Sequence, residues 1–378
     1  MVVNTRILYM LPWFHAGTGQ ETMIENIVQF GQGRWDSAIL SNHFFTFDGL
    51  FPTGSTVKLI NYKPYYSLLF PFRNLPRIVE NFDIIHIKSG VPYLKLFSNS
   101  KKPVIYNLHG PWATSGVGYK NKVQGILANN MERRLLNKAN TLVAVSKWVQ
   151  NYYIREMALD VIYIPDSFDL SRFKFKEKIP DKKHLKLLIV GDWDGFKGRK
   201  QQHELIRIMP MLTKEFPGIN LRLVGINPTN AKLLREYAEK IGSGRSVSID
   251  GKLTPTDLIA AYYESDILVV TSTVEGFHRP TVEAMACGRP VLARDSRALA
   301  GELNAGHFYH VRDSGGGETF DVSFQDITEK LWLIIENYSE MSVRARHYSL
   351  QFDNEKVGPL YEKLYAALID RKCGVIHE

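Results

Sequence analysis

Two glutamates, Glu275 and Glu283, lie eight positions apart in the stretch "STVEGFHRPTVEAMACGRP" of residues 272–290. The apolar run "DILVVTS" before them predicts a strand, and "RPTVEAMACG" predicts a helix. Pro280 suits the first turn of that helix, and Gly288 suits its end. Glu283 therefore lies in a first turn whose free N–H groups, together with the Arg279 guanidinium, favour a bound phosphate.

A carboxylate beside a phosphate cradle predicts a nucleoside diphosphate site. We expect the ribose at Glu283, the phosphates at Arg279 and the helix start, which includes Thr281, and a further group near Glu275. Charge-assisted hydrogen bonds of this kind contribute about 1.5–3 kcal/mol each. The alternative is that Glu283 only complements the dipole of its helix.

The stretch "EGFHRPTVEAMACGRPV" resembles the signature of family 4 of the retaining glycosyltransferases, which have the GT-B fold. That signature is Glu-Gly-Phe, a variable loop, then Glu-Ala-Met-Ala-Cys-Gly-x-Pro-Val, with seven residues between the glutamates. The resemblance implies that Glu275 approaches the donor sugar as a catalytic residue and that Glu283 binds the nucleotide ribose. The family often has Gly-Arg after the Phe, so Arg279 matches and His278 does not.

A second stretch, "VGDWDGFKGRKQ" of residues 190–201, is similar to the family's diphosphate clamp. Lys197 and Gly198 match its Lys-Gly pair, but Asp192 replaces its arginine. Three explanations stay open: Arg199 compensates, Arg279 compensates, or Asp192 turns away from the phosphates. Although "DWD" has the form of an Asp-x-Asp metal motif, such motifs belong to another glycosyltransferase fold class. We expect a metal-independent enzyme without a cofactor, using a UDP- or GDP-linked donor.

Two stretches of the first half of the chain also resemble the family. In "HAGTGQET" of residues 15–22, Gly19 and Glu21 match a Gly-Gly-x-Glu loop, which implies that Gly19 contacts the donor. In "VIYNLHGPW", His109 ends a predicted strand, and the resemblance implies that it faces the donor sugar as a second catalytic residue. The alternatives are an ordinary tight turn at Gly19 and a structural histidine at His109.

Short apolar runs alternate with helical periods along the chain, and this alternation predicts an α/β protein with parallel sheets covered on both faces. Strands are predicted at 6–11, 37–40, 82–87, 103–109, 141–146, 161–165, 185–191, 220–225, 266–272 and 290–294. A charged segment at 171–184 separates two such runs. We expect two doubly wound, Rossmann-like domains facing across a cleft, as in GT-B: 1–180 on the acceptor side and 181–355 binding the nucleotide sugar. Residues 356–378 are expected to form a helix that packs back on the first domain.

Composition narrows the class of protein. The net charge is +8, and 44% of residues are hydrophobic, as in an ordinary globular protein. Two cysteines, Cys287 and Cys373, exclude a disulfide framework, and the start lacks a signal-peptide layout, so we expect a cytoplasmic protein.

The positive charge is concentrated in residues 1–180, where 21 Lys and Arg face 12 Asp and Glu. This excess and the aromatic, basic segment 62–77 are consistent with an anionic or lipid-linked acceptor, or with weak association with the inner membrane surface. The alternatives are ordinary variation of charge along the chain and, for segment 62–77, loop and helix packing. No motif indicates nucleic-acid binding.

Taken together, these patterns predict a retaining glycosyltransferase of hexosyltransferase type, which moves a sugar from a nucleoside diphosphate to an acceptor hydroxyl. Two alternatives remain: a catalytically inactive sugar-nucleotide-binding protein, or a nucleotide-sugar epimerase or hydrolase of the same fold. The base, the sugar and the acceptor are not identified by the sequence.

Overall fold

The computed structural model describes residues 5–11, 14–15, 19–41, 44–45, 58–61, 75–88, 94, 100–110, 130–295, 306–321 and 323–372. The chain divides into two compact units, one of Met1–Phe168 with Phe352–Glu378 and the other of Asp169–Gln351. The boundary expected at 180 falls inside the second unit. Most of the aromatic segment 62–77 and Cys373 lie outside the described residues.

The first unit is built on a parallel sheet of order β5-β3-β1-β6-β7-β8-β9. Its strands are β1 (Arg6–Leu11), β3 (Asp36–Ser41), β5 (Lys58–Asn61), β6 (Ile84–Ile87), β7 (Val104–Leu108), β8 (Thr141–Ala144) and β9 (Val161–Tyr163), and β2 (Phe14–His15) pairs separately with β4 (Phe44–Phe45). Its helices include α1 (Gly19–Gly31), α2 (Leu75–Glu80), α4 (Lys147–Met157) and α13 (Asn354–Lys372). The apolar runs become buried strands because both faces of such a sheet are covered.

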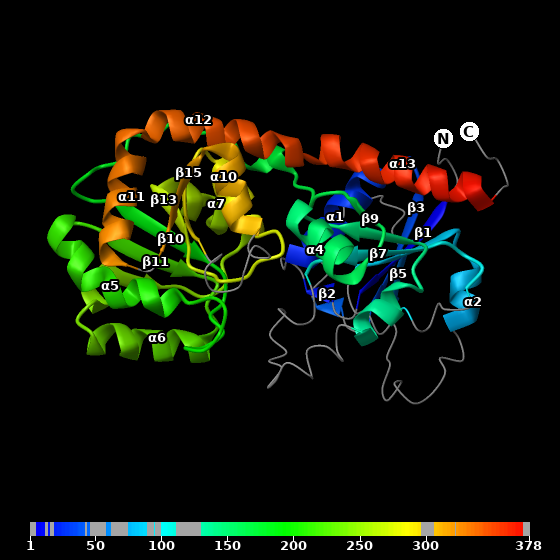
Figure 1. Ribbon diagram of the computed structural model, residues 1–378, viewed down its shortest axis with the longest axis horizontal. Coiled ribbons are helices and arrows are strands. Elements are labelled where there is room, and N and C mark those ends of the chain that lie inside the picture. Colours follow the sequence, from blue (N-terminus) through cyan, green and yellow to red (C-terminus); the bar gives the residue numbers. More distant parts are fainter. Residues whose placement is uncertain are drawn as a thin grey trace. The chain divides into compact units, whose positions relative to one another are not determined.

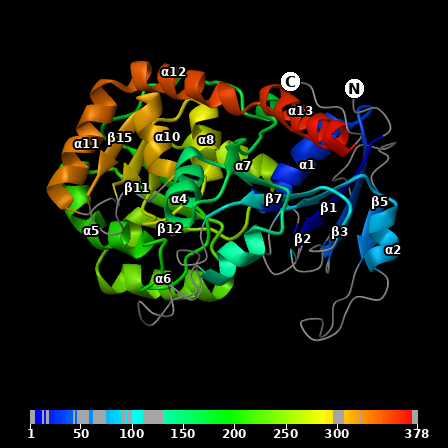
Figure 2. The same cartoon turned by 45° about the vertical axis from the view of Figure 1, so that its right-hand side comes forward.

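Helix α13 completes this unit and lies beside α1 (Figures 1 and 2). Gly358 allows the close approach, since a Cβ there would meet the ring of Phe30 at 2.3 Å. Beneath α13, the hydroxyl of Tyr365 lies 2.8 Å from Nδ1 of the fully buried His86 on β6. Asn107 on β7 also contacts His86 and donates to the hydroxyl of Tyr361 at 3.0 Å. These polar partners fix the position of α13 on the sheet, because buried polar groups must be satisfied.

The second unit has a parallel sheet of order β12-β11-β10-β13-β14-β15. Its strands are β10 (Lys186–Val190), β11 (Asn220–Val224), β12 (Val247–Ile249), β13 (Ile267–Val270), β14 (Val291–Arg294) and β15 (Gly317–Phe320). Its helices include α5 (Gln202–Glu215), α6 (Pro228–Lys240), α7 (Pro255–Glu264), α8 (Arg279–Ala286), α10 (Gly306–Ser314), α11 (Phe324–Glu336) and α12 (Tyr338–Ser349).

Helices cover both faces of this sheet. Leu187, Ile189, Leu221 and Leu223 point into a core shared with apolar residues of α5, α6 and α11. The alternate residues of each strand point to the other face, where α10 packs against β14 and β15 and α8 packs against β13 and β14. Figure 1 shows α5 and α6 on the side of the strands opposite to α10 and α12. The carboxyl ends of the strands, where ligands bind in doubly wound sheets, therefore meet at one edge.

The charged segment expected as a linker is held on the second unit. Lys178 donates to the carbonyl of Glu264 at 2.7 Å, at the end of α7, and forms an ion pair with Asp266 at 2.8 Å. The fully buried Arg289 donates to the carbonyl of Lys176. These contacts explain why the unit begins at Asp169 and not beyond the segment.

Candidate functional site

The connection from β13 to α8 carries both glutamates of the signature. Glu275 follows the carboxyl end of β13, and Glu283 lies within α8. As predicted, Pro280 occupies the first turn of α8, and Gly288 follows its end with a φ of 78°. His278, which stands where the family has glycine, is the N-cap residue with a φ of 65°. A non-glycine residue in this left-handed region carries backbone strain, which occurs most often at functional sites.

Glu275 lies against two cationic side chains. Its Oε1 is 2.7 Å from Nζ of Lys200 and 2.9 Å from a guanidinium nitrogen of Arg199. The carboxylate is buried, with 10% of its side chain exposed. Burial alone would raise the pKa of Glu275, but the neighbouring cations, Lys200 foremost, hold the pKa well below its usual range. Glu275 is therefore ionised, and the two cations beside it can also meet an anionic ligand.

The loop between β10 and α5 contains two lysines, Lys197 and Lys200, and its conformation brings only Lys200 to the carboxylate of Glu275. Lys197, the residue matched by the sequence, is exposed and forms no ion pair with any residue that the structure describes. Lys200 instead has its carbonyl bonded by the hydroxyl of Thr271 at 2.6 Å, and the carbonyl of Arg199 accepts from the N–H of Thr273 at 2.8 Å. Thr271 directly follows β13, and Thr273 lies two positions further along the chain. The backbone of residues 199–200 is thus attached beside the start of the glutamate loop.

The backbone at Gln201 supports the same assignment. Gln201 has a φ of 51°, a conformation that favours glycine. The pair Lys200-Gln201 therefore has the backbone geometry expected of a Lys-Gly pair directly before α5. From residue types alone, the Lys-Gly pair of the family matches Lys197-Gly198, three positions before Lys200-Gln201.

Asp192, which replaces the family's arginine, is directed at the start of α6. Its carboxylate accepts hydrogen bonds from the N–H of Asn227 at 3.0 Å, from the Asn227 side chain at 2.7 Å and from the Asn230 side chain at 3.1 Å. Burial works to raise the pKa of Asp192, and these hydrogen bonds outweigh it and lower the pKa. Of the three explanations left open by the sequence, the structure favours the one in which Asp192 turns away, while Arg199 supplies a cation near Glu275.

Glu283 keeps part of its carboxylate open, with 13% of the side chain exposed. Its Oε2 accepts a hydrogen bond from the hydroxyl of Tyr262 at 2.8 Å, and its Oε1 lies 3.9 Å from Nε of Arg279. Glu283 is the fifth residue of α8, so it lies just beyond the first turn in which the sequence predicted it, because the helix begins at Arg279. Thr281, in that first turn, is fully buried; its hydroxyl lies 2.8 Å from Nδ1 of His278 and its N–H bonds the carbonyl of His278. The polar groups of Thr281 are thus used within the turn.

The remaining expected residues belong to the first unit. His109 directly follows β7 and is half-buried, and the next residue, Gly110, has a φ of 141°. Gly19 is the first residue of α1, while residues 16–18 of its loop lie outside the described residues. Both therefore lie at element ends that suit ligand contact in a doubly wound sheet.

Two side chains that contact the signature glutamates, Lys200 and Tyr262, were not predicted from the sequence. Lys200 had one usable signal, the basic pair Arg199-Lys200 directly before a predicted helix. Tyr262 had none, because a tyrosine within "AAYYES" fits the apolar pattern of an ordinary buried helix position.

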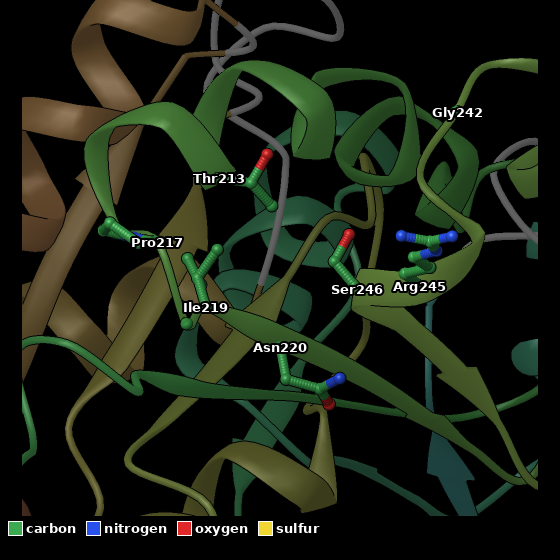
Figure 3. A pocket seen from close by; sticks show the side chains of 8 residues that line it. Thr213, Pro217, Ile219, Asn220, Gly242, Arg245 and Ser246 are labelled. Carbon is green, nitrogen blue, oxygen red and sulfur yellow. The ribbon is translucent and has the colours of Figure 1, made fainter.

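A cavity of about 330 Å³ in the second unit lies elsewhere (Figure 3). It is lined in part by Asn220, the first residue of β11, and by Ser246, directly before β12. It therefore opens at the amino ends of these parallel strands, at the edge opposite to the glutamate loop.

Within the described ranges, no group of three or more His, Cys, Asp or Glu side chains could hold a metal ion. Among the helices of these ranges, none has the length and apolarity needed to cross a bilayer.

Comparison with known proteins places these features in a class. The model of the glycosyl transferases group 1 matches residues 171–346, and that of Glycosyltransferase Family 4 matches residues 18–172. A structure of HepE from Anabaena in complex with UDP and glucose superposes with a TM-score of 0.75 at 19% identity, over 96% of this chain and 100% of that one. This likeness confirms the GT-B fold expected for a glycosyltransferase. Because the two family models together cover residues 18–346, the chain belongs to family 4 of the glycosyltransferases.

Curated relatives match only part of the chain. Glycogen synthase of Mycobacterium tuberculosis is 25% identical over 224 residues, 57% of this chain and 53% of the relative. Phosphatidyl-myo-inositol mannosyltransferase of the same species is 24% identical over 237 residues, 61% of this chain and 59% of the relative. The matched part of the chain thus spans somewhat more than half the length of these relatives.

Proposed function

We propose that the protein is a retaining glycosyltransferase that moves a hexosyl group from a nucleoside diphosphate to an acceptor hydroxyl. The observation that carries this proposal is that both glutamates of the segment from β13 to α8 lie beside a cation. Glu275 lies beside Lys200, and Glu283 lies beside Arg279. Family membership gives this arrangement its chemical meaning. A binding protein for neutral sugars would have no need of these cations.

The donor is held by charge and by hydroxyl recognition. Glu283 accepts hydrogen bonds from the ribose, while Arg279 and the first turn of α8 bind the diphosphate. Lys200 and Arg199 extend the cationic surface to Glu275, which orients the hydroxyls of the sugar. When the sugar leaves, negative charge grows on the diphosphate, and cations held in place stabilise it without reorganisation.

Several finer assignments rest on the family pattern and belong to the same proposal. His109 contacts the donor sugar, and Gly19 contacts the donor through its backbone. The acceptor hydroxyl attacks from the side on which the diphosphate departs, so the anomeric configuration is retained, and no metal ion takes part. The donor is UDP- or GDP-linked; the solved structure of HepE holds UDP, which makes UDP-sugars the first panel to test.

The nature of the acceptor follows from charge. Residues 1–180 carry an excess of nine positive charges, from 21 basic and 12 acidic residues, which favours an anionic or lipid-linked acceptor and weak attachment to a cytoplasmic membrane surface. Co-sedimentation of the full chain with vesicles containing anionic lipid, at low and at high salt, tests this attachment. Equal sedimentation with neutral vesicles would contradict it.

The transfer reaction is tested by incubating the protein with UDP- and GDP-sugars and measuring released nucleoside diphosphate by mass spectrometry, with and without candidate acceptors, and with a chelator. Release that depends on an acceptor supports transfer, and the anomeric proton coupling of the product reports retention. Release without an acceptor indicates a hydrolase, a changed sugar indicates an epimerase, and binding without turnover indicates an inactive sugar-nucleotide-binding protein.

A further inference from the structure

Tyr262 is a buried polar side chain that the proposed chemistry does not yet use. It lies in α7, is fully buried, and its hydroxyl donates to Oε2 of Glu283 at 2.8 Å. Two separate helices, α7 and α8, are thus joined by a hydrogen bond at one carboxylate. A hydrogen bond to an ionised group is stronger than a neutral one, so this contact restrains the carboxylate strongly.

The ring of Tyr262 is itself held in place. Thr254 caps the start of α7 by accepting from the N–H of Asp257 at 3.2 Å. The ring packs edge-on against Phe173, with centroids 6.5 Å apart. The hydroxyl is therefore presented to Glu283 from a rigid helix and a fixed ring. Burial, and next the charge of Glu283, raise the pKa of Tyr262 well above its ordinary value, so the phenol keeps the proton that it donates.

The remaining geometry of Glu283 suits a ribose. A carboxylate offers about four lone-pair positions, and Tyr262 occupies one of them. Oε1 lies 3.9 Å from the Arg279 Nε atom, too far for a hydrogen bond, so it can accept from a ligand. An unrestrained glutamate would lose rotamer freedom on binding, at a cost of about 1.5–2 kcal/mol. A glutamate already held by Tyr262 avoids much of this cost.

We propose that Tyr262 is a positioning residue, which holds Glu283 in the orientation that accepts the ribose hydroxyls of the donor. This proposal rests on the proposed function of Glu283. Tyr262 touches no substrate atom; it acts on nucleotide affinity through the carboxylate. Its effect is therefore confined to ligands that carry ribose hydroxyls.

The test is Tyr262→Phe, which removes one hydroxyl and keeps the ring. Calorimetric titration measures the Kd of the tighter binder of UDP and GDP, and that of its 2′,3′-dideoxy analogue. We expect the ribonucleotide to bind about tenfold more weakly to the variant, the loss of one hydrogen bond to a charged group. The dideoxy analogue is expected to bind both proteins equally. In turnover, KM for the donor rises while kcat at saturating donor is unchanged.

Tyr263→Phe is the matched control. Tyr263 neighbours Tyr262 in α7, but its hydroxyl bonds the carbonyl and the N–H of Lys174 and not the carboxylate of Glu283. We expect this variant to keep the affinity of the ribonucleotide. Equal loss in both variants would overturn the proposal, because it would show a general effect of α7.

The variant Glu283→Gln distinguishes the ribose-binding role of Glu283 from the positioning role of Tyr262. Unchanged ribonucleotide affinity in Glu283→Gln would refute the ribose role of Glu283 itself. Weakened affinity in Glu283→Gln with unchanged affinity in Tyr262→Phe would refute only the positioning role. An equal loss for ribonucleotide and dideoxy analogue in Tyr262→Phe would likewise assign Tyr262 to packing.

The double variant Tyr262→Phe/Glu283→Gln keeps the test available if the single tyrosine variant does not fold. It leaves no charged carboxylate without its donor, so the cost of the lost hydrogen bond is smaller. A positioning residue acts only through Glu283, so the double variant should bind the ribonucleotide as weakly as Glu283→Gln alone. A further loss in the double variant would overturn the proposal.

Discussion

The assignment of Lys200 in place of Lys197 gives the sharpest prediction. Lys200→Met removes the ammonium that lies 2.7 Å from Oε1 of Glu275 and keeps most of the aliphatic stem. Lys197→Met makes the same change in the exposed residue that the sequence matches. The two substitutions lie three positions apart in one loop, so each is a control for the other.

The magnitude follows from the contacts. Lys200 is the more buried of the two cations at Glu275, with 17% of its side chain exposed, so its charge is screened less by solvent. Losing one charge-assisted contact to a diphosphate costs about 1.5–3 kcal/mol, or about 10- to 150-fold in Kd. Arg199, 2.9 Å from the same carboxylate, keeps Glu275 paired, so the variant should still fold. For Lys197→Met we expect a change within about twofold.

The assay is calorimetric titration of UDP and GDP into both variants and the unmodified protein at two salt concentrations, with melting temperatures as the check of folding. The reasoning is refuted if Lys197→Met loses more affinity than Lys200→Met. It is also refuted if Lys200→Met folds and binds as the unmodified protein does. Either result would mean that the ligand-bound loop differs from the loop seen here.

Three further predictions concern stability. Ala158 ends α4 with a φ of 49°, so Ala158→Gly should stabilise the protein by about 1 kcal/mol in urea denaturation; no gain would contradict the strain argument. Asp192→Ala should cost about 1–2 kcal/mol through the lost bonds to the start of α6, yet change UDP affinity less than threefold; a large affinity change would return Asp192 to the phosphate site. Burial lowers the pKa of His310 from 6.5 to about 3, so unfolding takes up a proton between these values and stability falls as the pH drops. His310→Gln should flatten that fall by up to about 1.4 kcal/mol per pH unit, and an unchanged slope in acid denaturation series would contradict it.

Much of the fold could be predicted because parallel strands buried on both faces leave an obvious pattern. The apolar runs at 6–11, 185–191 and 220–225 became β1, β10 and β11, and the helix within the signature begins at Arg279, as its proline indicates. Short β5 and β15 were not predicted, since Lys58–Asn61 and Gly317–Phe320 have no such apolar run.

The positions of the candidate site residues could be predicted where these residues are neighbours in sequence. Glu275, Arg279 and Glu283 lie on one loop and the helix that follows it, so their spacing indicated that they lie near one another. The partner of Asp192 lies 35 positions away at Asn227, and that of Glu283 lies 21 positions away at Tyr262. Such pairs depend on how separate elements pack, which residue type and spacing do not encode. The choice of Lys200 over Lys197 depends on the positive φ of Gln201, which the residue types around Gln201 do not reveal.

The division of the chain has a consequence for biosynthesis. The N–H of Phe168 bonds the carbonyl of Phe352 at 3.0 Å, and the N–H of Asn354 returns to the carbonyl of Phe168 at 2.8 Å. The ribosome therefore makes the whole of residues 169–351 before the strand partner of Phe168 and the tyrosines of α13 exist. Until then, His86 and Asn107 in the nascent first unit lack their tyrosine partners. That unit can therefore close only after residues 352–372 have emerged, and not when its first 168 residues have.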